Sequence, residues 1–174
     1  MIFQTNRCVV REMVSSDLAA FTKLHGNPKV MDIIPAPVLS SEQCMKNLHG
    51  IMDNYRSQKS NVLVWGVETK ADKSWIGTCA LVFEKDNRIE IGYRFDPEYW
   101  GRGFGSEIAN ALIDFAFQTT KAHEVFADVN SVNSNSVKIL EKVLSFKGKT
   151  ENSELGVTDL NFALTRDTWL QNQD

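Results

Sequence analysis

Three glycines in the segment YWGRGFGSE, residues 99–107, have the spacing of an anion-binding loop. Gly101, Gly103 and Gly105 alternate between an expected strand and an expected helix, where unpaired backbone N–H groups and the helix dipole favour a negative charge. Glycine also lets the backbone approach phosphate oxygens closely and adopt positive φ. Arg102 adds a positive charge beside the loop. The pattern predicts a pyrophosphate site, although a tight strand-to-helix turn without a ligand would use the same glycines.

Two common phosphate motifs do not match this loop. A P-loop ends in Gly-Lys-Ser or Gly-Lys-Thr, whereas Gly105 is followed by Ser106 and Glu107. The dinucleotide-binding fingerprint needs a third glycine where Ser106 stands, and it opens a parallel β-α-β unit. Here three strands of antiparallel character precede the loop. The sequence therefore disfavours both kinds of site.

Hydrophobic patterning indicates the elements that hold this loop in place. Strand character occurs at residues 7–12, 61–67, 75–83, 89–95, 125–129 and 157–164, with a further short strand as an option near Phe146. Helical spacing predicts helices from Ser15-Ser16-Asp17 to Gly26, from Ser40 to about Arg56, from Ile108 to Ala116 and from Ser136 to Leu144. The order β-α-α-β-β-β-α-β-α-β predicts a mixed sheet covered by helices.

The composition is that of one globular domain over residues 1–174. Of the 174 residues, 43% are hydrophobic and 24% are charged, which excludes disorder, and the net charge of −3 disfavours direct nucleic-acid binding. The chain has no apolar run of about 20 residues, and its start does not resemble a signal peptide, so we expect a cytoplasmic protein without a membrane partner. Cys8, Cys44 and Cys79 are expected as buried apolar residues rather than as disulfides or metal ligands.

Several motifs, taken in their order along the chain, are similar to those of a known family. They are the strand from Arg7 to Arg11, Ser16-Asp17-Leu18, Ile76-Gly77, Glu90-Ile91-Gly92-Tyr93, the loop 99–107, Asn133-Ser134-Asn135-Ser136 and Leu140-Glu141-Lys142. From Arg7 to Trp169 the sequence resembles the Gcn5-related N-acetyltransferases (GNAT), in particular the RimJ and RimL branch of ribosomal-protein N-terminal acetyltransferases. This resemblance implies an α/β (α+β) fold with a mixed, mostly antiparallel sheet, flanked by helices and splayed at the coenzyme site.

The resemblance also implies where acetyl-coenzyme A binds. The coenzyme is expected in the gap between the strand ending at Phe95 and the strand 125–129, without a metal. The amides of the glycine loop are expected to hold its pyrophosphate, namely those of Gly101, Arg102, Gly103, Phe104, Gly105 and Ser106. The backbone of Tyr93, Arg94 and Phe95 is expected to bind the pantetheine arm and to polarise the thioester carbonyl. Asn133 is either a turn former or a further coenzyme contact.

Transfer of an acetyl group to an amine needs a base, an oxyanion donor and a proton for the departing thiolate. Glu90, acting directly or through water, is the first candidate for the base, and Asp128 is the alternative; either acid could instead be a surface residue paired with a cation. Many relatives carry a tyrosine acid where this chain has Leu140. The resemblance therefore assigns the proton donor to Ser136, which would otherwise serve as a helix cap.

The remaining candidates concern the acceptor and the bulky side chains. An α-amine has an ordinary pKa of about 7.7 to 8.0, against about 10.4 for lysine, which favours a protein N-terminus, such as that of a ribosomal protein, as the acceptor. The alternative within enzymes is a small-molecule amine acceptor such as a polyamine, an amino acid or an aminoglycoside. The alternative outside enzymes is a non-catalytic acyl-coenzyme A-binding module. His25, His49 and His123 are expected at the surface or as caps, and Trp65 and Trp75 in the core. No feature of the sequence indicates the oligomeric state.

Overall fold

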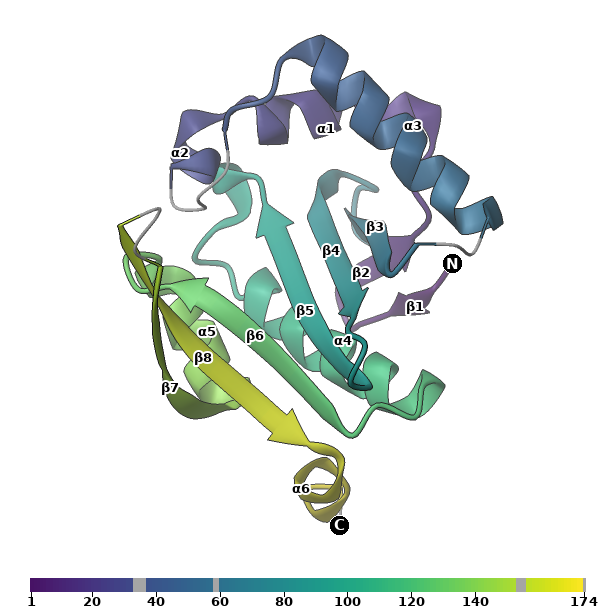
Figure 1. Cartoon of the computed structure of the whole chain (residues 1–174). Coiled ribbons are helices and arrows are strands. Elements are labelled where there is room, and N and C mark those ends of the chain that lie inside the picture. The colour runs from purple at the N-terminus through teal and green to yellow at the C-terminus, as the bar shows by residue number, and fades with distance from the viewer. Residues whose placement is uncertain (33–36, 58–59, 153–155, 174) are drawn as a thin grey trace.

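The computed structural model describes residues 1–32, 37–57, 60–152 and 156–173, and its centre is one eight-stranded sheet (Figure 1). The strand order is β1-β2-β3-β4-β5-β6-β8-β7. Every neighbouring pair is antiparallel except β5 and β6, which are parallel. The strands are β1 (Phe3–Gln4), β2 (Cys8–Arg11), β3 (Val62–Thr69), β4 (Trp75–Phe83), β5 (Arg88–Phe95), β6 (Glu124–Asn130), β7 (Ser145–Asn152) and β8 (Val157–Thr165). The expected mixed, mostly antiparallel sheet is confirmed.

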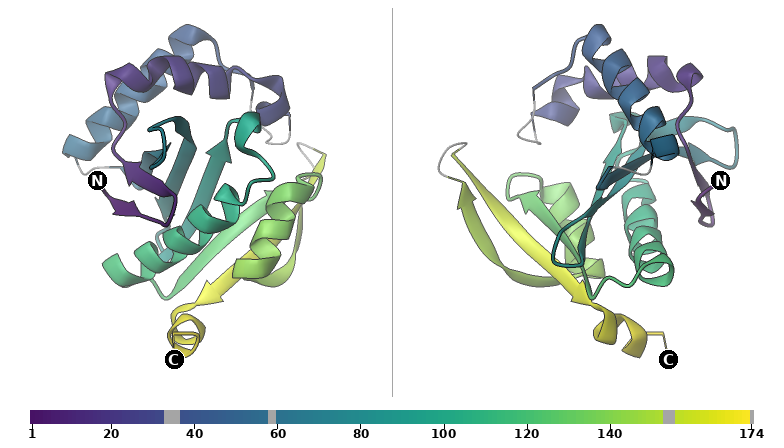
Figure 2. Two further views of the ribbon diagram at one scale, coloured as in Figure 1. Left: turned by 180° about the vertical axis from the view of Figure 1, so that it is seen from behind. Right: turned by 45° about the vertical axis from the view of Figure 1, so that its right-hand side comes forward.

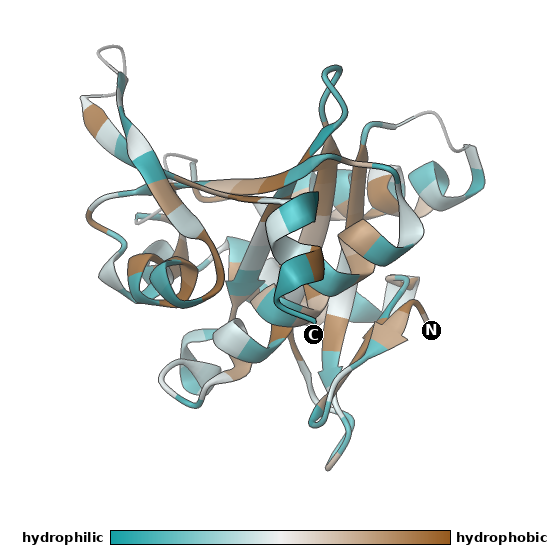
Figure 3. Cartoon of the chain, turned by 90° about the horizontal axis from the view of Figure 1, so that it is seen from below, coloured by the Kyte–Doolittle hydropathy of each residue, from teal (hydrophilic) through white to brown (hydrophobic). Residues whose placement is uncertain are grey.

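Helices cover both faces of the sheet (Figures 1 and 2). The helices are α1 (Leu18–His25), α2 (Pro28–Met31), α3 (Ser41–Ser57), α4 (Phe104–Thr119), α5 (Ser134–Val143) and α6 (Arg166–Gln171), with single 3₁₀ turns at Ser15–Asp17 and Pro97–Tyr99. The buried residues of α4 share a core with β2 to β6, whereas α1 and α3 pack around Met13, Phe21 and Leu48 on the other face. In Figure 3 the central strands are mostly hydrophobic, and hydrophilic residues gather at the ends of the hairpins.

Local signals set most of the boundaries, and one of them corrects an expectation. The Ser40 hydroxyl accepts from Gln43 N at 3.2 Å and the Gln43 side chain accepts from Ser40 N at 2.8 Å, which is the predicted capping box. At α5 the cap is Asn133, whose side chain accepts from Ser136 N at 3.2 Å. Ser136 therefore lies inside the first turn, and the interpretation of Ser136 as the helix cap is wrong. The C-terminal cap of α5 is Leu144, whose backbone is extended. This helix therefore ends without the left-handed glycine that is common at this position.

The parallel pair β5 and β6 separates along its length. Pairing joins Arg88 to Glu124, Ile89 to Val125 and Glu90 to Phe126, and the described residues show no pairing of the two strands beyond that point. In the right-hand view of Figure 2, β6, β7 and β8 lean away from the strands that precede them. The predicted splayed gap is thus present between the second half of β5 and β6.

The core contains the residues expected there. Cys8, Cys44 and Cys79 are buried free thiols, and Trp65 is 3% exposed. Trp75 packs on the opposite face, against the residues of α1, α2 and α3. Over the described parts of the chain, none of the helices is long and apolar enough to cross a bilayer.

Candidate active site

The glycine loop has the backbone conformation that its sequence predicts. Gly101 and Gly103 have φ values of 71° and 82°, in the left-handed region that favours glycine. Gly103 is the N-cap of α4, so the unpaired N–H groups in the first turn of this 16-residue helix face the space over the loop. Gly105 has a different role, because a Cβ there would lie 2.6 Å from Cδ1 of Ile139 and the Ile139 side chain would have to move.

An N-terminal clasp, formed by Thr5, Arg7 and Glu107, holds this loop. The Glu107 carboxylate accepts from Thr5 Oγ1 at 2.6 Å, from Arg7 N at 2.8 Å and from Arg7 Nε at 2.6 Å. The Arg7 guanidinium also donates to the carbonyl of Arg102 at 2.9 Å and lies 4.3 Å from the ring centroid of Phe104. Burial raises the pKa of Glu107, but the bonds from Thr5 and Arg7 outweigh it and hold that pKa below its ordinary value. Sequence reasoning missed this clasp.

The backbone of β5 leaves hydrogen-bonding groups in the gap. Asp96 N donates to Ile76 O at 2.9 Å, so the alternation of an antiparallel ladder directs the backbone of Arg94 towards β4 and that of Tyr93 and Phe95 towards β6. The Phe95 carbonyl accepts from Trp100 Nε1 at 2.8 Å. The N–H groups of Tyr93 and Phe95 and the Tyr93 carbonyl therefore face the space from which β6 has departed.

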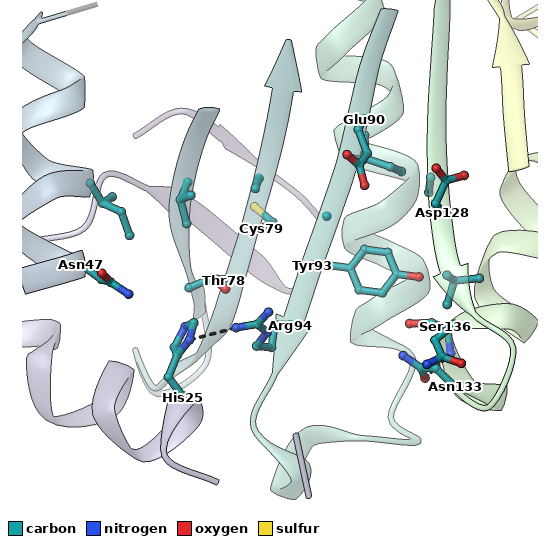
Figure 4. A pocket seen from close by; sticks show the side chains of 18 of the residues that line it. His25, Asn47, Thr78, Cys79, Glu90, Tyr93, Arg94, Asp128, Asn133 and Ser136 are labelled. Carbon is teal, nitrogen blue, oxygen red and sulfur yellow. Dashed lines mark hydrogen bonds between the residues drawn. The ribbon is translucent and has the colours of Figure 1, made fainter. Parts of the chain in front are cut away.

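Two cavities meet at this gap. The smaller, of about 250 Å³, lies over the loop and contains most of the predicted coenzyme residues, namely Tyr93, Arg94, Phe95, Gly101, Gly103, Phe104, Gly105, Ser106 and Asn133. Arg102 is exposed and does not line it; its guanidinium lies 5.5 Å from the Tyr99 ring centroid. The larger cavity, of about 890 Å³, lies between α1, α3 and the sheet (Figure 4). Four residues line both cavities: Tyr93, Arg94, Asn133 and Ser136.

Glu90 lies in the larger cavity and is half-buried. Burial raises the pKa of its carboxyl, and the neighbouring charges of Asp128 and Glu84 raise it further. Within the described residues Glu90 has no cationic partner, so the alternative that Glu90 is a surface residue paired with a cation is wrong. Asp128 is exposed and accepts from Asn161 Nδ2 at 2.8 Å. A carboxylate with a raised pKa and no partner is suited to accept a proton.

A tyrosine side chain lies where the two cavities meet, and sequence reasoning assigned it only a backbone role. The Tyr93 ring points from β5 across the gap towards α5 (Figure 4). Its buried hydroxyl has no partner of ordinary hydrogen-bond geometry in the described structure, and the Ser136 hydroxyl faces it. Burial raises the pKa of Tyr93 to about 12, and Ser136 offsets part of that rise. Leu140 is buried nearby, so this tyrosine lies close to the position that lacks one on α5.

His25 corrects another expectation, because it is half-buried in the wall of the larger cavity and its ring contacts a side chain, so it is neither a free surface residue nor a helix cap. Arg94 Nη1 lies 2.9 Å from His25 Nδ1 (Figure 4), and Phe21 packs on the imidazole with 4.1 Å between ring centroids. Burial, and then the charge of Arg94, lower the pKa of His25 to about 4. Arginine only donates, so neutral His25 accepts at Nδ1 and carries its proton on Nε2, which is buried without a partner in the described structure. His49 and His123 are exposed, as expected.

The described residues contain no group of three or more His, Cys, Asp or Glu side chains that could hold a metal ion. Trp65 and Trp75 line neither of the two cavities. The polar groups of the site are therefore the loop amides, the backbone of β5 and the side chains described above.

A helix N-terminus with left-handed glycines, beside two parallel strands that separate, defines an acyl-coenzyme A-binding transferase of the GNAT fold. The profile of the acetyltransferase (GNAT) domain matches residues 7–143 of this chain. An uncharacterized N-acetyltransferase, p20 of Bacillus licheniformis, is 30% identical over 148 residues, which cover 82% of this chain and 80% of that protein. The chain belongs to the GNAT acetyltransferase family and is an acetyl-CoA-dependent N-acetyltransferase.

Solved structures show the same fold. Spermidine N-acetyltransferase from Vibrio cholerae, in complex with CoA and spermine, has a TM-score of 0.79 at 19% identity, over 94% of this chain and 98% of that one. The ribosomal L7/L12 α-N-protein acetyltransferase RimL, in complex with coenzyme A, has a TM-score of 0.79 at 17% identity, over 96% of this chain and 98% of that one. The GNAT resemblance is thus confirmed, and the RimJ and RimL branch stays a prediction.

Proposed function

We propose that this enzyme acetylates the N-terminal α-amine of a protein or peptide. The observation that carries this proposal is the size of the larger cavity, about 890 Å³. This volume lies near the upper end of the range for pockets that hold drug-sized ligands, so it admits the first residues of a peptide. An α-amine also needs less help with deprotonation than a lysine side chain does. Ribosomal proteins are the acceptors that the RimJ and RimL resemblance favours.

The residues of the smaller cavity fit acetyl-coenzyme A. The left-handed turn at Gly101 and Gly103 presents amides at the positive end of α4, which suits a pyrophosphate. The strand-like backbone groups of Tyr93 and Phe95 suit the amides of a pantetheine arm, because they replace the missing partner strand. The alternation along β5 directs the backbone of Arg94 towards β4, so we propose that the Arg94 backbone does not bind the pantetheine arm and that its side chain faces the acceptor.

Each catalytic requirement has a candidate group where the cavities meet. Bound acetyl-CoA supplies an activated acetyl thioester. A backbone N–H of β5 would stabilise the oxyanion that develops on the thioester carbonyl, which is worth about 3 kcal/mol for one well-placed donor. Glu90 would take a proton from the attacking amine, directly or through water. The hydroxyls of Ser136 and Tyr93 would supply the proton that the departing thiolate needs.

A polyamine or another small amine is the second candidate acceptor. Spermidine N-acetyltransferase from Vibrio cholerae has the same fold as this chain, and the acids Glu90, Asp128 and Asp159 line the larger cavity. These acids would attract a cationic acceptor. A non-catalytic acyl-CoA-binding role would leave the raised pKa of Glu90 and the orphan hydroxyl of Tyr93 without a use.

The decisive experiment measures release of coenzyme A thiol. Purified enzyme and acetyl-CoA are mixed with a panel of short peptides with free N-termini, the same peptides with blocked N-termini, and spermidine. We expect thiol release with free peptides and none with blocked ones, and mass spectrometry should place the acetyl group on the α-amine. Turnover with spermidine alone would refute a peptide acceptor, and no release with any amine would refute catalysis.

A further inference from the structure

The side chain of Arg94 is partly buried and has no acidic partner in the part of the chain that the structure describes. Its hydrogen bond goes to neutral His25, at 2.9 Å. Other partly buried arginines have stronger acceptors: Arg11 pairs with the carboxylates of Asp17 and Glu68, and Arg166 donates to three backbone carbonyls. Burial lowers the pKa of Arg94, since the charged form loses water without gaining an anion.

Arg94 lies at one end of a trough, which is the part of the larger cavity over Arg94, Gly92 and Glu90 of β5. Side chains on one face of a strand alternate, so Arg94, Gly92 and Glu90 line the floor of the larger cavity. Gly92 contributes no side chain, and Ala80 lies opposite it in β4. Between Arg94 and Glu90 the Cα atoms are about 13 Å apart at ordinary strand rise, so the two charges stand at opposite ends of a space with small residues between them.

Neighbouring groups at the Arg94 end are suited to an anion. Thr78 is the cross-strand partner of Arg94 in β4, so its side chain lies beside the guanidinium on the same face. The side chain of Asn47, from α3, also points into the cavity (Figure 4). His25 keeps the guanidinium in place through Nδ1. A guanidinium with a hydroxyl and an amide nearby is a common recognition set for a carboxylate.

We propose that Arg94 binds a carboxylate of the acceptor, so that the substrate is an amine that also carries a nearby negative charge. This inference rests on the proposed acetyl transfer and names the acceptor chemistry. Two sources supply such a carboxylate: the α-carboxylate of a free amino acid, and an acidic side chain next to the N-terminal residue of a peptide. The amine of either would point along the trough towards Glu90 and the gap. A polyamine would bring only positive charge to Arg94 and is disfavoured.

The test compares acceptors that differ only in this charge. One pair is two amidated tetrapeptides with Asp or Asn as the second residue; the other is alanine and alaninamide; spermidine is the cation-only arm. The enzymes are wild type, Arg94→Gln, Arg94→Lys and Arg56→Gln, where Arg56 is exposed at the end of α3 and lines neither cavity. Thiol release gives kcat/KM for each combination, and calorimetry gives the coenzyme Kd.

We expect kcat/KM of wild type to be about tenfold to a hundredfold higher for the carboxylate member of one pair, the range of a hydrogen bond to a charged group. Arg94→Gln should remove this preference through KM, Arg94→Lys should restore part of it, and Arg56→Gln should leave it unchanged. The pair that shows the preference identifies the source. Equal use of both members of each pair, a preference for spermidine, or a weaker coenzyme Kd in Arg94→Gln would overturn the inference.

A binding measurement separates this inference from the acetyl transfer itself. Two pairs of products are titrated into wild type and Arg94→Gln with coenzyme A present: N-acetylalanine with N-acetylalaninamide, and the N-acetylated tetrapeptide amides with Asp or Asn as the second residue. Tighter binding of the acid in either pair, lost in the variant, would support the carboxylate site even if no amine were acetylated. Equal binding within both pairs would overturn it even if peptides were acetylated.

Discussion

Replacing Tyr93 by phenylalanine should make the protein more stable and the enzyme slower. The buried hydroxyl of Tyr93 has no partner of ordinary geometry in the described structure, and an unsatisfied buried polar group costs about 1 to 3 kcal/mol. Tyr93→Phe should therefore raise the free energy of unfolding by about 1 kcal/mol. For a chain of this size that corresponds to a melting temperature about 2 to 4 °C higher.

The expected loss of rate comes from the proton that the thiolate needs. With a pKa of about 12, the Tyr93 hydroxyl is protonated at neutral pH, and it faces Ser136 at the meeting point of the two cavities. A thiol with an ordinary pKa of about 8.5 can leave as its thiolate with only partial help, so we expect kcat to fall about tenfold to a hundredfold in Tyr93→Phe and in Ser136→Ala. If the two hydroxyls act in series, the double variant should lose little more than either single one.

Tyr55→Phe is the matched control. The Tyr55 hydroxyl accepts from Met13 N at 3.1 Å and donates to the carbonyl of Val64, and it lines neither cavity. This control should lower the melting temperature and leave kcat unchanged at temperatures where the protein is folded. The rates are measured from pH 6 to 9 by steady-state and single-turnover kinetics, and the gap between variant and parent should narrow as pH rises. Full activity of Tyr93→Phe across that range would refute a proton role for Tyr93.

Three further changes test the loop, the clasp and the buried histidine. Gly103→Asp should abolish coenzyme binding in calorimetry without unfolding, because it adds a negative charge and a left-handed penalty of about 1 to 2 kcal/mol where the phosphate approaches; unchanged affinity would contradict the role of the loop. Glu107→Gln should weaken coenzyme binding severalfold in calorimetry and lower the free energy of unfolding by about 1 kcal/mol in denaturant unfolding. The stability difference between variant and parent should vanish at acid pH, where Glu107 is protonated in the folded and the unfolded state. His25 binds a proton more weakly when folded, so stability should fall by about 1 to 2 kcal/mol as pH drops from 6.5 towards 4. His25→Gln should remove that fall, and NMR titration should show a higher His25 pKa in Arg94→Gln.

Local patterns predicted the parts of the site that depend on local conformation. The spacing of Gly101 and Gly103 indicates where the backbone turns left-handed, and the strand predicted at residues 89–95 directs the neighbouring side chains of Tyr93 and Arg94 to opposite faces. The divergence of β5 from β6 was expected only from the family resemblance, because no local pattern distinguishes a strand pair that separates from one that stays paired.

Contacts between distant segments were not predictable in this way. Arg7 and Glu107 are 100 positions apart, and His25 and Arg94 are 69 positions apart. Each residue taken alone is an ordinary surface type, and its role appears only when the helix or strand that carries it packs against another. Hydrophobic periodicity indicates which face of α1 is buried, but not which strand lies beneath its last turn. The side-chain role of Tyr93 was missed for a related reason, since an aromatic residue on the apolar face of a strand is normally core.

Buried polar atoms without a hydrogen-bond partner distinguish the site from the rest of the core. In the described structure the buried side-chain atoms without a partner are Tyr93 Oη, His25 Nε2 and Trp75 Nε1. The Trp75 atom packs near Gly66 of β3 and lines neither of the two cavities described, so it is only a small local cost. The other two line the larger cavity beside Arg94, whose charge also lacks an anion. Packing alone would not favour three such groups around one cavity, and a ligand that pairs with them would offset their cost in stability. Coenzyme and a carboxylate-bearing acceptor together should therefore raise the melting temperature more than the coenzyme alone.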